Sequence, residues 1–106
     1  MKILPRSEEL VLLAILHLRD NAYGVTIRRY LAQVTGQNLS ISSVYVPLDR
    51  LTDKGYVRAF DKPSTEARDG RRRRFFNVTP GGIQALAEVE RVQKIMWSGY
   101  YQLALG

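Results

Sequence analysis

The sequence of 106 residues contains no cysteine and only one histidine. Without cysteine the chain has no disulfides, no thiolate metal ligands and no cysteine nucleophile. No Ser-His-Asp set, metal-ligand spacing or glycine-rich phosphate loop can be assembled around His17, which stands between two leucines as a structural histidine does. The sequence therefore predicts a protein that is not an enzyme, with no metal site and no cofactor.

Long hydrophobic runs are also missing. The longest, Leu10 to Leu16, is far shorter than the roughly 20 apolar residues that a membrane span needs. Lys2 and Arg6 precede this run as basic residues precede the core of a signal peptide. However, Glu8 and Glu9 stand at its start, and no small-residue cleavage site follows it. We therefore predict a cytoplasmic protein with no membrane partner.

Acidic residues are outnumbered by basic ones. The chain has 16 Lys and Arg against 10 Asp and Glu, which gives a net charge of +6 and a pI near 10.0. Such a balance favours a polyanionic partner, either nucleic acid or an anionic membrane surface. The length and the 45% of hydrophobic residues predict one globular domain with a modest core.

Two helices are predicted in the first third of the chain. Ser7 is expected to cap the first helix, and the apolar run after it is expected to be mostly buried. The second helix is predicted from about Val25 to Thr35, and Gly36 is its expected left-handed C-cap. Helical spacing places four of its side chains inward: Ile27, Tyr30, Leu31 and Val34.

A third helix and a β-hairpin follow. The segment from Ser42 to Leu51 has the spacing of a helix capped by Ser42 or Ser43, and Gly55 ends it. Two strands, Val57–Phe60 and Arg72–Val78, are joined by a polar loop that ends in Asp69-Gly70 and four arginines. The alternation of Leu39-Ser40-Ile41 predicts a short third strand beside them.

The last helix is predicted to open with Thr79 as its cap and Pro80 at its first position, and to continue as a single helix. Its apolar stripe is too long for a small core to cover, and soluble proteins rarely expose such a patch. We therefore predict a homodimer in which the stripe is buried, with these interface residues: Leu86, Val89, Val92, Met96, Trp97 and Tyr100.

The predicted fold class is mainly α with a small β-hairpin wing, that is, a winged helix-turn-helix with a C-terminal dimerisation helix. Residues 1–79 would form the DNA-binding unit and residues 80–106 the dimerisation helix of one single domain. In such a fold the third helix enters a DNA groove and the wing holds the flanking phosphates. The predicted DNA-binding residues are Ser42, Ser43, Tyr45, Val46, Arg50, Arg71, Arg72, Arg73 and Arg74.

Three motifs resemble the PadR family of bacterial transcriptional regulators. They are Tyr23-Gly24-x-x-Ile27, the block from Ser43 to Val57 that contains Val44-Tyr45, Arg50-Leu51 and Lys54-Gly55-Tyr56, and Arg74-Phe75-Phe76-x-Val78-Thr79-Pro80-x-Gly82. The resemblance covers about residues 8 to 90 and implies a winged-helix homodimer that usually represses transcription, of the small subfamily with a single C-terminal helix. Asp49 and Ser42-Ser43 depart from it, because many members have a lysine and a Pro-Gly or Gly there.

Three functions remain open from the sequence. The first is a sequence-specific DNA-binding regulator, a homodimeric repressor of a palindromic operator on double-stranded DNA. The second is a winged-helix protein-interaction module without specific DNA binding. The third is a regulator under the control of a small-molecule effector, in which Trp97 lines an aromatic cavity at the dimer interface.

Overall fold

The computed structural model describes residues 2–64 and 71–106. Asp69 and Gly70 of the predicted wing loop lie outside them. The elements are α1 (Arg6–Leu18), the 3-10 turn η1 (Arg19–Asn21), α2 (Gly24–Thr35), α3 (Ser42–Asp53), β1 (Val57–Pro63), β2 (Arg72–Val78), α4 (Pro80–Trp97) and α5 (Tyr100–Leu105).

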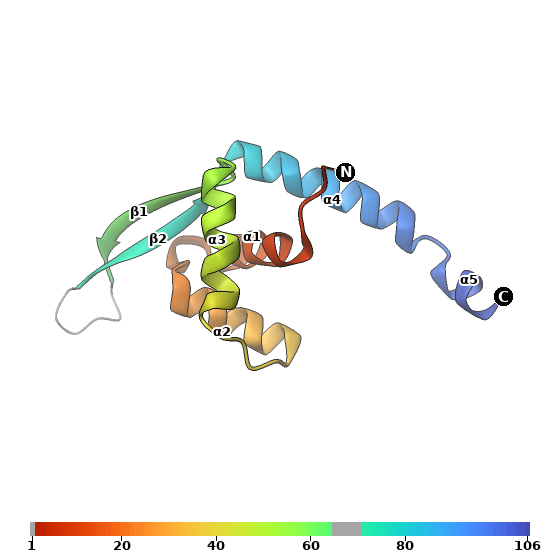
Figure 1. Ribbon diagram of the computed structural model, residues 1–106, viewed down its shortest axis with the longest axis horizontal. Helices are drawn as coiled ribbons and strands as arrows, with labels where there is room; N and C mark the ends of the chain where they lie inside the picture. The colour runs from red at the N-terminus through yellow and green to blue at the C-terminus, as the bar shows by residue number, and fades with distance from the viewer. Residues whose placement is uncertain (1, 65–70) are drawn as a thin grey trace.

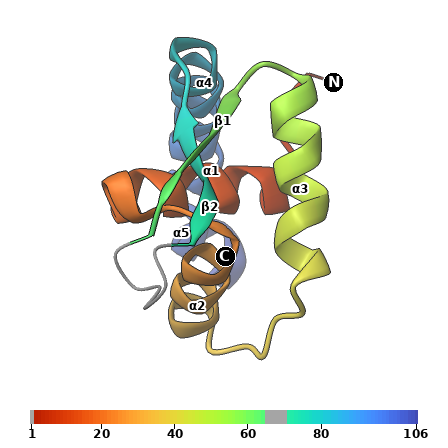
Figure 2. The ribbon, with the colours of Figure 1, turned by 90° about the vertical axis from the view of Figure 1, so that its left-hand side faces the viewer.

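Helices α1, α2 and α3 form the body of the molecule, and two long elements leave it in opposite directions. The hairpin of β1 and β2 extends to one side, and α4 extends to the other side and ends in α5 (Figure 1). Viewed from the wing side, the hairpin and α3 lie next to each other in front of α1 (Figure 2). The molecule is consequently elongated, with extents of 60 × 29 × 20 Å.

The core lies where the three helices meet the root of the hairpin. Leu12 and Ile15 of α1, Ile27 of α2, and Leu48 and Leu51 of α3 are all 2% exposed or less. These positions recur at helical spacing, so each helix turns one apolar face inward. Helical spacing predicts Val44, Leu48 and Leu51 as the inward face of α3, and all three are buried.

The hairpin is antiparallel, with Val57 opposite Val78 and Pro63 opposite Arg72. The first strand runs to Pro63, three residues further than the sequence suggested. Phe75 and Phe76 point to opposite faces but are 3% and 5% exposed, because the body of the molecule covers both faces of the hairpin root.

Several predicted boundaries are confirmed. Gly36 and Gly55 adopt left-handed backbone with φ of 69° and 78° after α2 and α3. Thr79 caps α4 by accepting a hydrogen bond from the Gly82 N–H at 3.2 Å, with Pro80 in the first turn.

The predicted cap of α1 is wrong. The helix begins at Arg6, with Pro5 as the residue before it, and Ser7 lies inside the first turn without a capping hydrogen bond. The Pro5 carbonyl accepts the Glu9 N–H at 3.0 Å and so starts the helical ladder two residues earlier than predicted.

The apolar run of α1 is mostly buried, as predicted, with Leu13 and Leu16 as exceptions at 37% and 42% exposed, since a continuous run surrounds the helix and only part of it faces the core. The predicted burial of Val34 is wrong. Val34 is 61% exposed, because the last residue that α2 contributes to the core is Leu31.

The predicted third strand does not form, and the described sheet has two strands. The carbonyl groups of residues 39–41 are used elsewhere. The Leu39 carbonyl accepts from Arg28 at 3.2 Å, and those of Ser40 and Ile41 accept the first N–H groups of α3.

The prediction of a single C-terminal helix is wrong as well. The α4 helix ends at Trp97, Ser98 is extended, and Gly99 is left-handed with φ 69°, so α5 is a separate helix.

Candidate nucleic-acid interface

The outer face of α3 carries all the residues of this helix that were predicted to meet DNA. Ser42, Ser43 and Arg50 are exposed, and Tyr45 and Val46 are 43% and 47% exposed. The opposite face is buried in the core. The helix can therefore present one continuous surface to a groove without any change in packing.

Hydroxyl groups cluster at the N-terminal end of α3. The Ser40 hydroxyl lies 2.8 Å from the Ser43 hydroxyl and 3.1 Å from the Ser42 hydroxyl. Its oxygen also accepts the Ser43 N–H at 3.3 Å. Ser42 and Ser43 were predicted to cap the helix, but they lie in its first turn and Ser40 accepts the hydrogen bond instead. The result is an exposed cluster of hydroxyl groups at the start of α3, where the helix dipole favours an anion.

Tyr45 rests on the first turn of α2. A Cβ atom added at Gly24 would lie 2.6 Å from the Tyr45 Cζ and would overlap the phenolic oxygen. Glycine at position 24 therefore leaves the space in which the ring lies. The contact brings the Tyr45 hydroxyl to the N-terminus of α2, where the helix dipole favours an anion.

The wing arginines fall into two groups. Arg72 and Arg74 are exposed and turn toward Asp61 of β1. The Arg72 Nη2 donates to the Asp61 carbonyl at 2.9 Å, and the Arg74 Nε lies 3.8 Å from the Asp61 carboxylate. These exposed pairs are weak and leave both cations accessible to phosphate. Arg71 is exposed and directly precedes the first residue of β2.

Arg73 points the other way and belongs to the wing root. Its guanidinium carbon lies 5.0 Å from the centre of the Tyr23 ring, within range of a cation–π interaction. Its Nε is buried without a hydrogen-bond partner among the described residues. Of the four predicted arginines, this one is held against the protein.

Further contacts fix the wing on the body. The Tyr23 and Phe75 rings pack edge to face at 5.3 Å. The Lys62 ammonium lies 4.3 Å from the centre of the Phe75 ring and donates to the Asp20 carbonyl at 2.7 Å. The wing is thus fixed on the same body that carries α3, and Figure 2 shows the outer ends of β1 and β2 and the N-terminal end of α3 in the lower part of the view.

A family model described as "Transcriptional regulator PadR-like family" matches residues 12–88 of the chain. The chain belongs to the PadR-like family. It is a DNA-binding transcriptional regulator and not an enzyme, as the sequence predicted. The match ends at Glu88, so the distal half of α4 and all of α5 lie beyond it.

Solved structures of PadR regulators have the same fold. A PadR-like transcriptional regulator from Bacillus cereus is 21% identical with a TM-score of 0.79, and the alignment covers 93% of this chain and 91% of that one. A PadR family regulator from Clostridium difficile is 21% identical with a TM-score of 0.71, covering 93% and 98%. One from Eggerthella lenta is 25% identical with a TM-score of 0.69, covering 90% and 80%. No curated protein matches the chain.

The C-terminal stripe of this PadR-like chain is buried at one end only. Val89 is only 5% exposed, on the side of α4 that faces α1, and Leu86 and Val92 are half-buried. Met96 and Trp97 are 71% and 62% exposed. Trp97 packs edge to face on Tyr100 at 4.9 Å, and a hydrogen bond to Tyr101 raises the pKa of Tyr100.

Sequence reasoning treated Glu8 and Glu9 only as charges at a helix end and missed that both are buried and paired within the PadR-like body. Glu8 is 1% exposed and accepts from Lys54, at the end of α3, at 2.6 Å. Glu9 is 5% exposed and accepts from Gln93 of α4 at 2.9 Å. The signal was available, since Glu8 lies one and two helical turns before the buried residues Leu12 and Ile15.

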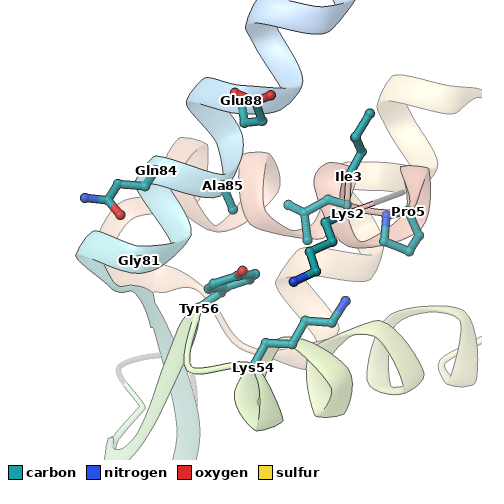
Figure 3. Close-up of a pocket in the computed structure, with 10 residues that line it drawn as sticks. Lys2, Ile3, Pro5, Lys54, Tyr56, Gly81, Gln84, Ala85 and Glu88 are labelled. Atoms are coloured by element: carbon teal, nitrogen blue, oxygen red, sulfur yellow. The ribbon is translucent and has the colours of Figure 1, made fainter.

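Two hollows flank α4. The first, of about 660 Å³, lies between the N-terminal arm, the end of α3 and the start of α4. Lys2 and Lys54 extend into it beside the Tyr56 ring (Figure 3). The second, of about 370 Å³, is a groove between α1 and α4.

No group of three metal-ligating side chains occurs in residues 2–64 and 71–106. Within the same ranges, no helix combines the length and the apolar character that crossing a membrane requires.

Proposed function

We propose that this PadR-like chain is a homodimeric repressor that binds a palindromic operator through α3 and the wing. The observation that carries the proposal is the exposed face of α3 beside the exposed Arg72 and Arg74, all held in one arrangement by the wing root. Residues 1–79 form the DNA-binding unit of this proposal, and residues 80–106 hold the dimer as part of the same domain.

Within this proposal, α3 lies in the major groove. Ser43 and Val46 stand on its first two turns and reach base edges, Ser43 by hydrogen bonding and Val46 by contact with a thymine methyl group. Ser42, Tyr45 and Arg50 contact the phosphates beside them, together with the N-termini of α2 and α3.

The wing follows the backbone next to the half-site. Arg71, Arg72 and Arg74 neutralise phosphates, while Arg73 supports the wing from below through Tyr23. Such contacts position a protein on DNA without selecting sequence. Specificity therefore rests on α3 and on the symmetry of the dimer.

The dimer follows from the exposed apolar end of α4. A monomer would leave Met96, Trp97 and the aromatic residues of α5 in water, a contiguous patch that soluble proteins rarely expose. A two-fold axis near Met96 and Trp97 buries the patch in an isologous contact. The two copies of α3 then lie about 34–36 Å apart and select half-sites with centres about 10 base pairs apart. A dimer bound across a promoter represses by occlusion.

A second function is favoured by one observation, the exposed Trp97 beside Tyr100. In the dimer these rings meet their symmetry mates, and a flat apolar or cationic effector could stack between them. Quenching of Trp97 fluorescence in a compound titration, with loss of DNA affinity at the same concentration, tests effector control.

The experiment that tests the DNA-binding proposal is selection of bound fragments from genomic DNA, followed by substitution in α3. Val46→Ala should change the preference at one or two base positions by roughly 1–3 kcal/mol and leave binding to random DNA nearly unchanged. Equal losses on operator and random DNA would place Val46 among the backbone contacts. Equal affinity of the wild type for both DNAs would favour the protein-interaction module.

A further inference from the structure

Asp49 is exposed at the centre of the outer face of α3. The inward direction of the helix is fixed by its four buried residues, Val44, Pro47, Leu48 and Leu51. At about 100° per residue, Val46 and Asp49 stand on either side of the opposite direction, each within about 30° of it. Tyr45 and Arg50 stand about 70° from it on the two sides. Asp49 therefore shares with Val46 the middle of the surface that α3 would turn toward DNA.

The fold itself gives no reason for this carboxylate. Within residues 2–64 and 71–106, Asp49 forms no ion pair and no side-chain hydrogen bond. It stands four residues before Asp53, the last residue of α3. Like charges at that spacing repel each other on a helix, and the helix dipole disfavours anions near this end. A neutral or basic residue would suit the isolated helix better, which points to a partner outside the chain.

The chemistry of a DNA groove restricts what this partner can be. Phosphates repel a carboxylate, so it can be paired on DNA only by the hydrogen-bond donors of the base edges. In the major groove these donors are the N4 amino group of cytosine and the N6 amino group of adenine. Adenine has the acceptor N7 beside its donor, guanine presents two acceptors, and thymine presents an acceptor and a methyl group. Cytosine is therefore the base whose edge suits a carboxylate best.

The position of Asp49 on the helix matches the length of its side chain. The middle of the outer face comes closest to the floor of a groove, where a short side chain can reach a base. The longer side chains of Tyr45 and Arg50, at the edges of this face, turn toward the phosphate walls. Asp49 follows Val46 by about 4.5 Å along the helix, which corresponds to about one or two base-pair steps.

We propose that Asp49 determines operator specificity by accepting a hydrogen bond from the N4 amino group of a cytosine in the major groove. This contact rests on the proposed binding of α3 in that groove and adds a second base contact beside that of Val46. Asp49 selects in two ways. It pairs with cytosine, and it repels the acceptor atoms of guanine and thymine at the same position. A charge that weakens binding to DNA in general thus sharpens the choice of sequence.

Substitutions at position 49 test this contact on duplexes that carry each of the four base pairs in turn along a half-site. The half-site comes from the fragments that the full-length protein selects, and the salt concentration is held constant because phosphate contacts depend on it. The wild type should prefer cytosine at one position by roughly tenfold or more. Asp49→Ala should lose this preference and bind random DNA more tightly, since its repulsion from the phosphates is gone. Asp49→Asn should shift the preference toward adenine, because asparagine pairs with N6 and N7 of that base.

Asp53→Ala is the matched control, since it removes the same charge from the same helix one turn further on. It should bind random DNA more tightly and keep the preference for cytosine. Both aspartates are exposed, so neither substitution threatens the fold, and urea denaturation checks that all variants are folded.

The outcomes separate the base contact from DNA binding itself. If Asp49→Ala keeps the base preferences of the wild type at every position, the contact with cytosine is overturned and DNA binding by α3 stands. An equal loss of the cytosine preference in Asp53→Ala would show that net charge acts instead of a base contact, which also overturns it. A wild type that binds selected and random DNA equally overturns the proposed operator binding and the cytosine contact together.

Discussion

At the scale of single residues, the most informative contact joins two motifs that lie 21 positions apart. Gly24 and Tyr45 can be read from the sequence separately, but the sequence does not show that the tyrosine ring occupies the space above the glycine. The glycine is needed for close approach and not for an unusual backbone angle, because it is the first residue of α2. The position of the Tyr45 hydroxyl therefore depends on a residue that itself offers no side chain to DNA.

Gly24→Ala should weaken DNA binding with little loss of stability. The new methyl group displaces the Tyr45 ring, whose far end can swing into solvent, so the phosphate contact is lost while the core stays intact. We expect about a tenfold rise in Kd, equal to roughly 1.4 kcal/mol, measured by fluorescence anisotropy with labelled operator. Gly81→Ala is the matched control, since a Cβ there has ordinary contacts of 3.6 Å or more. If Gly24→Ala binds the operator as tightly as the wild type, Tyr45 does not contact the DNA.

Burial distinguishes two ion pairs of the same length. The Lys54–Glu8 and Arg91–Glu88 pairs are both 2.6 Å long, but the Glu8 side chain is 1% exposed and that of Glu88 is 49% exposed. Lys54→Met leaves the buried Glu8 carboxylate without its partner. It should lower the free energy of unfolding by between about 1 and 3 kcal/mol, measured by urea denaturation.

The control for this pair is Arg91→Met, which should lower the free energy of unfolding much less than Lys54→Met does, because both members of the Arg91–Glu88 pair are solvated. Adding Glu8→Gln to Lys54→Met removes the uncompensated charge, so the double variant should be more stable than the sum of the single losses predicts. Strict additivity would show that the buried pair carries no coupling.

At the scale of elements, the sequence predicted three helix boundaries that local signals set. Gly36, Gly55 and the Thr79-Pro80 cap mark helix ends because left-handed backbone and N–H capping are properties of a few neighbouring residues. The expected serine caps of α1 and α3 are wrong by one or two residues, and the predicted third strand fails because it depends on distant partners. Residues 39–41 alternate like a strand, yet Arg28 and the first turn of α3 take their carbonyl groups.

The same distinction holds for the candidate site. The exposed face of α3 follows from helical spacing alone. The separation of Arg73 from Arg72 and Arg74 follows partly from strand alternation, but its contact with Tyr23 does not. The break at Ser98-Gly99 was missed because apolar residues continue on both sides of it, and periodicity alone does not show where a helix ends.

The wing arginines should separate into two functions when substituted. Arg72→Ala with Arg74→Ala should weaken binding to all DNA about equally and reduce the slope of log K against log salt by about 0.9 for each lost phosphate contact. Stability should not change, because both side chains are exposed. Arg73→Ala should instead destabilise the fold by about 1 kcal/mol through loss of the cation–π contact with Tyr23. Salt titrations of DNA binding and urea denaturation, carried out on both variants, test the two expectations. An unchanged slope of log K against log salt in the double variant would show that Arg72 and Arg74 do not bind phosphate.

At the scale of the whole molecule, the single chain is more extended than its length requires. Its radius of gyration is 15.8 Å, whereas a compact chain of this length has about 13 Å. The excess comes from the hairpin and α4, which leave the body in opposite directions (Figure 1). Each extension exposes a different chemistry, cationic on the wing and apolar on α4 and α5. The proposed division between DNA contact and self-association would explain both.

Truncation after Arg91 should separate these two functions. It removes Met96, Trp97 and α5 but keeps Val89, which completes the packing of α4 on α1. The shortened chain should therefore stay folded and sediment as a monomer at micromolar concentration. Because α3 and the wing remain, it should keep weak, salt-sensitive binding to any DNA.

Without the two-fold axis, the truncated chain should lose its preference for two half-sites over one. A monomer on one half-site makes only one set of base contacts. A dimer makes both sets but loses translational freedom only once, so its affinity for the whole palindrome is much higher. Comparing the intact palindrome with a duplex in which one half-site is scrambled measures this directly. The full-length protein should distinguish the two duplexes by at least a hundredfold, and the truncated one hardly at all. A truncated chain that still sediments as a dimer would place self-association on the body of the molecule, and the exposed aromatic end of α4 would then need another partner.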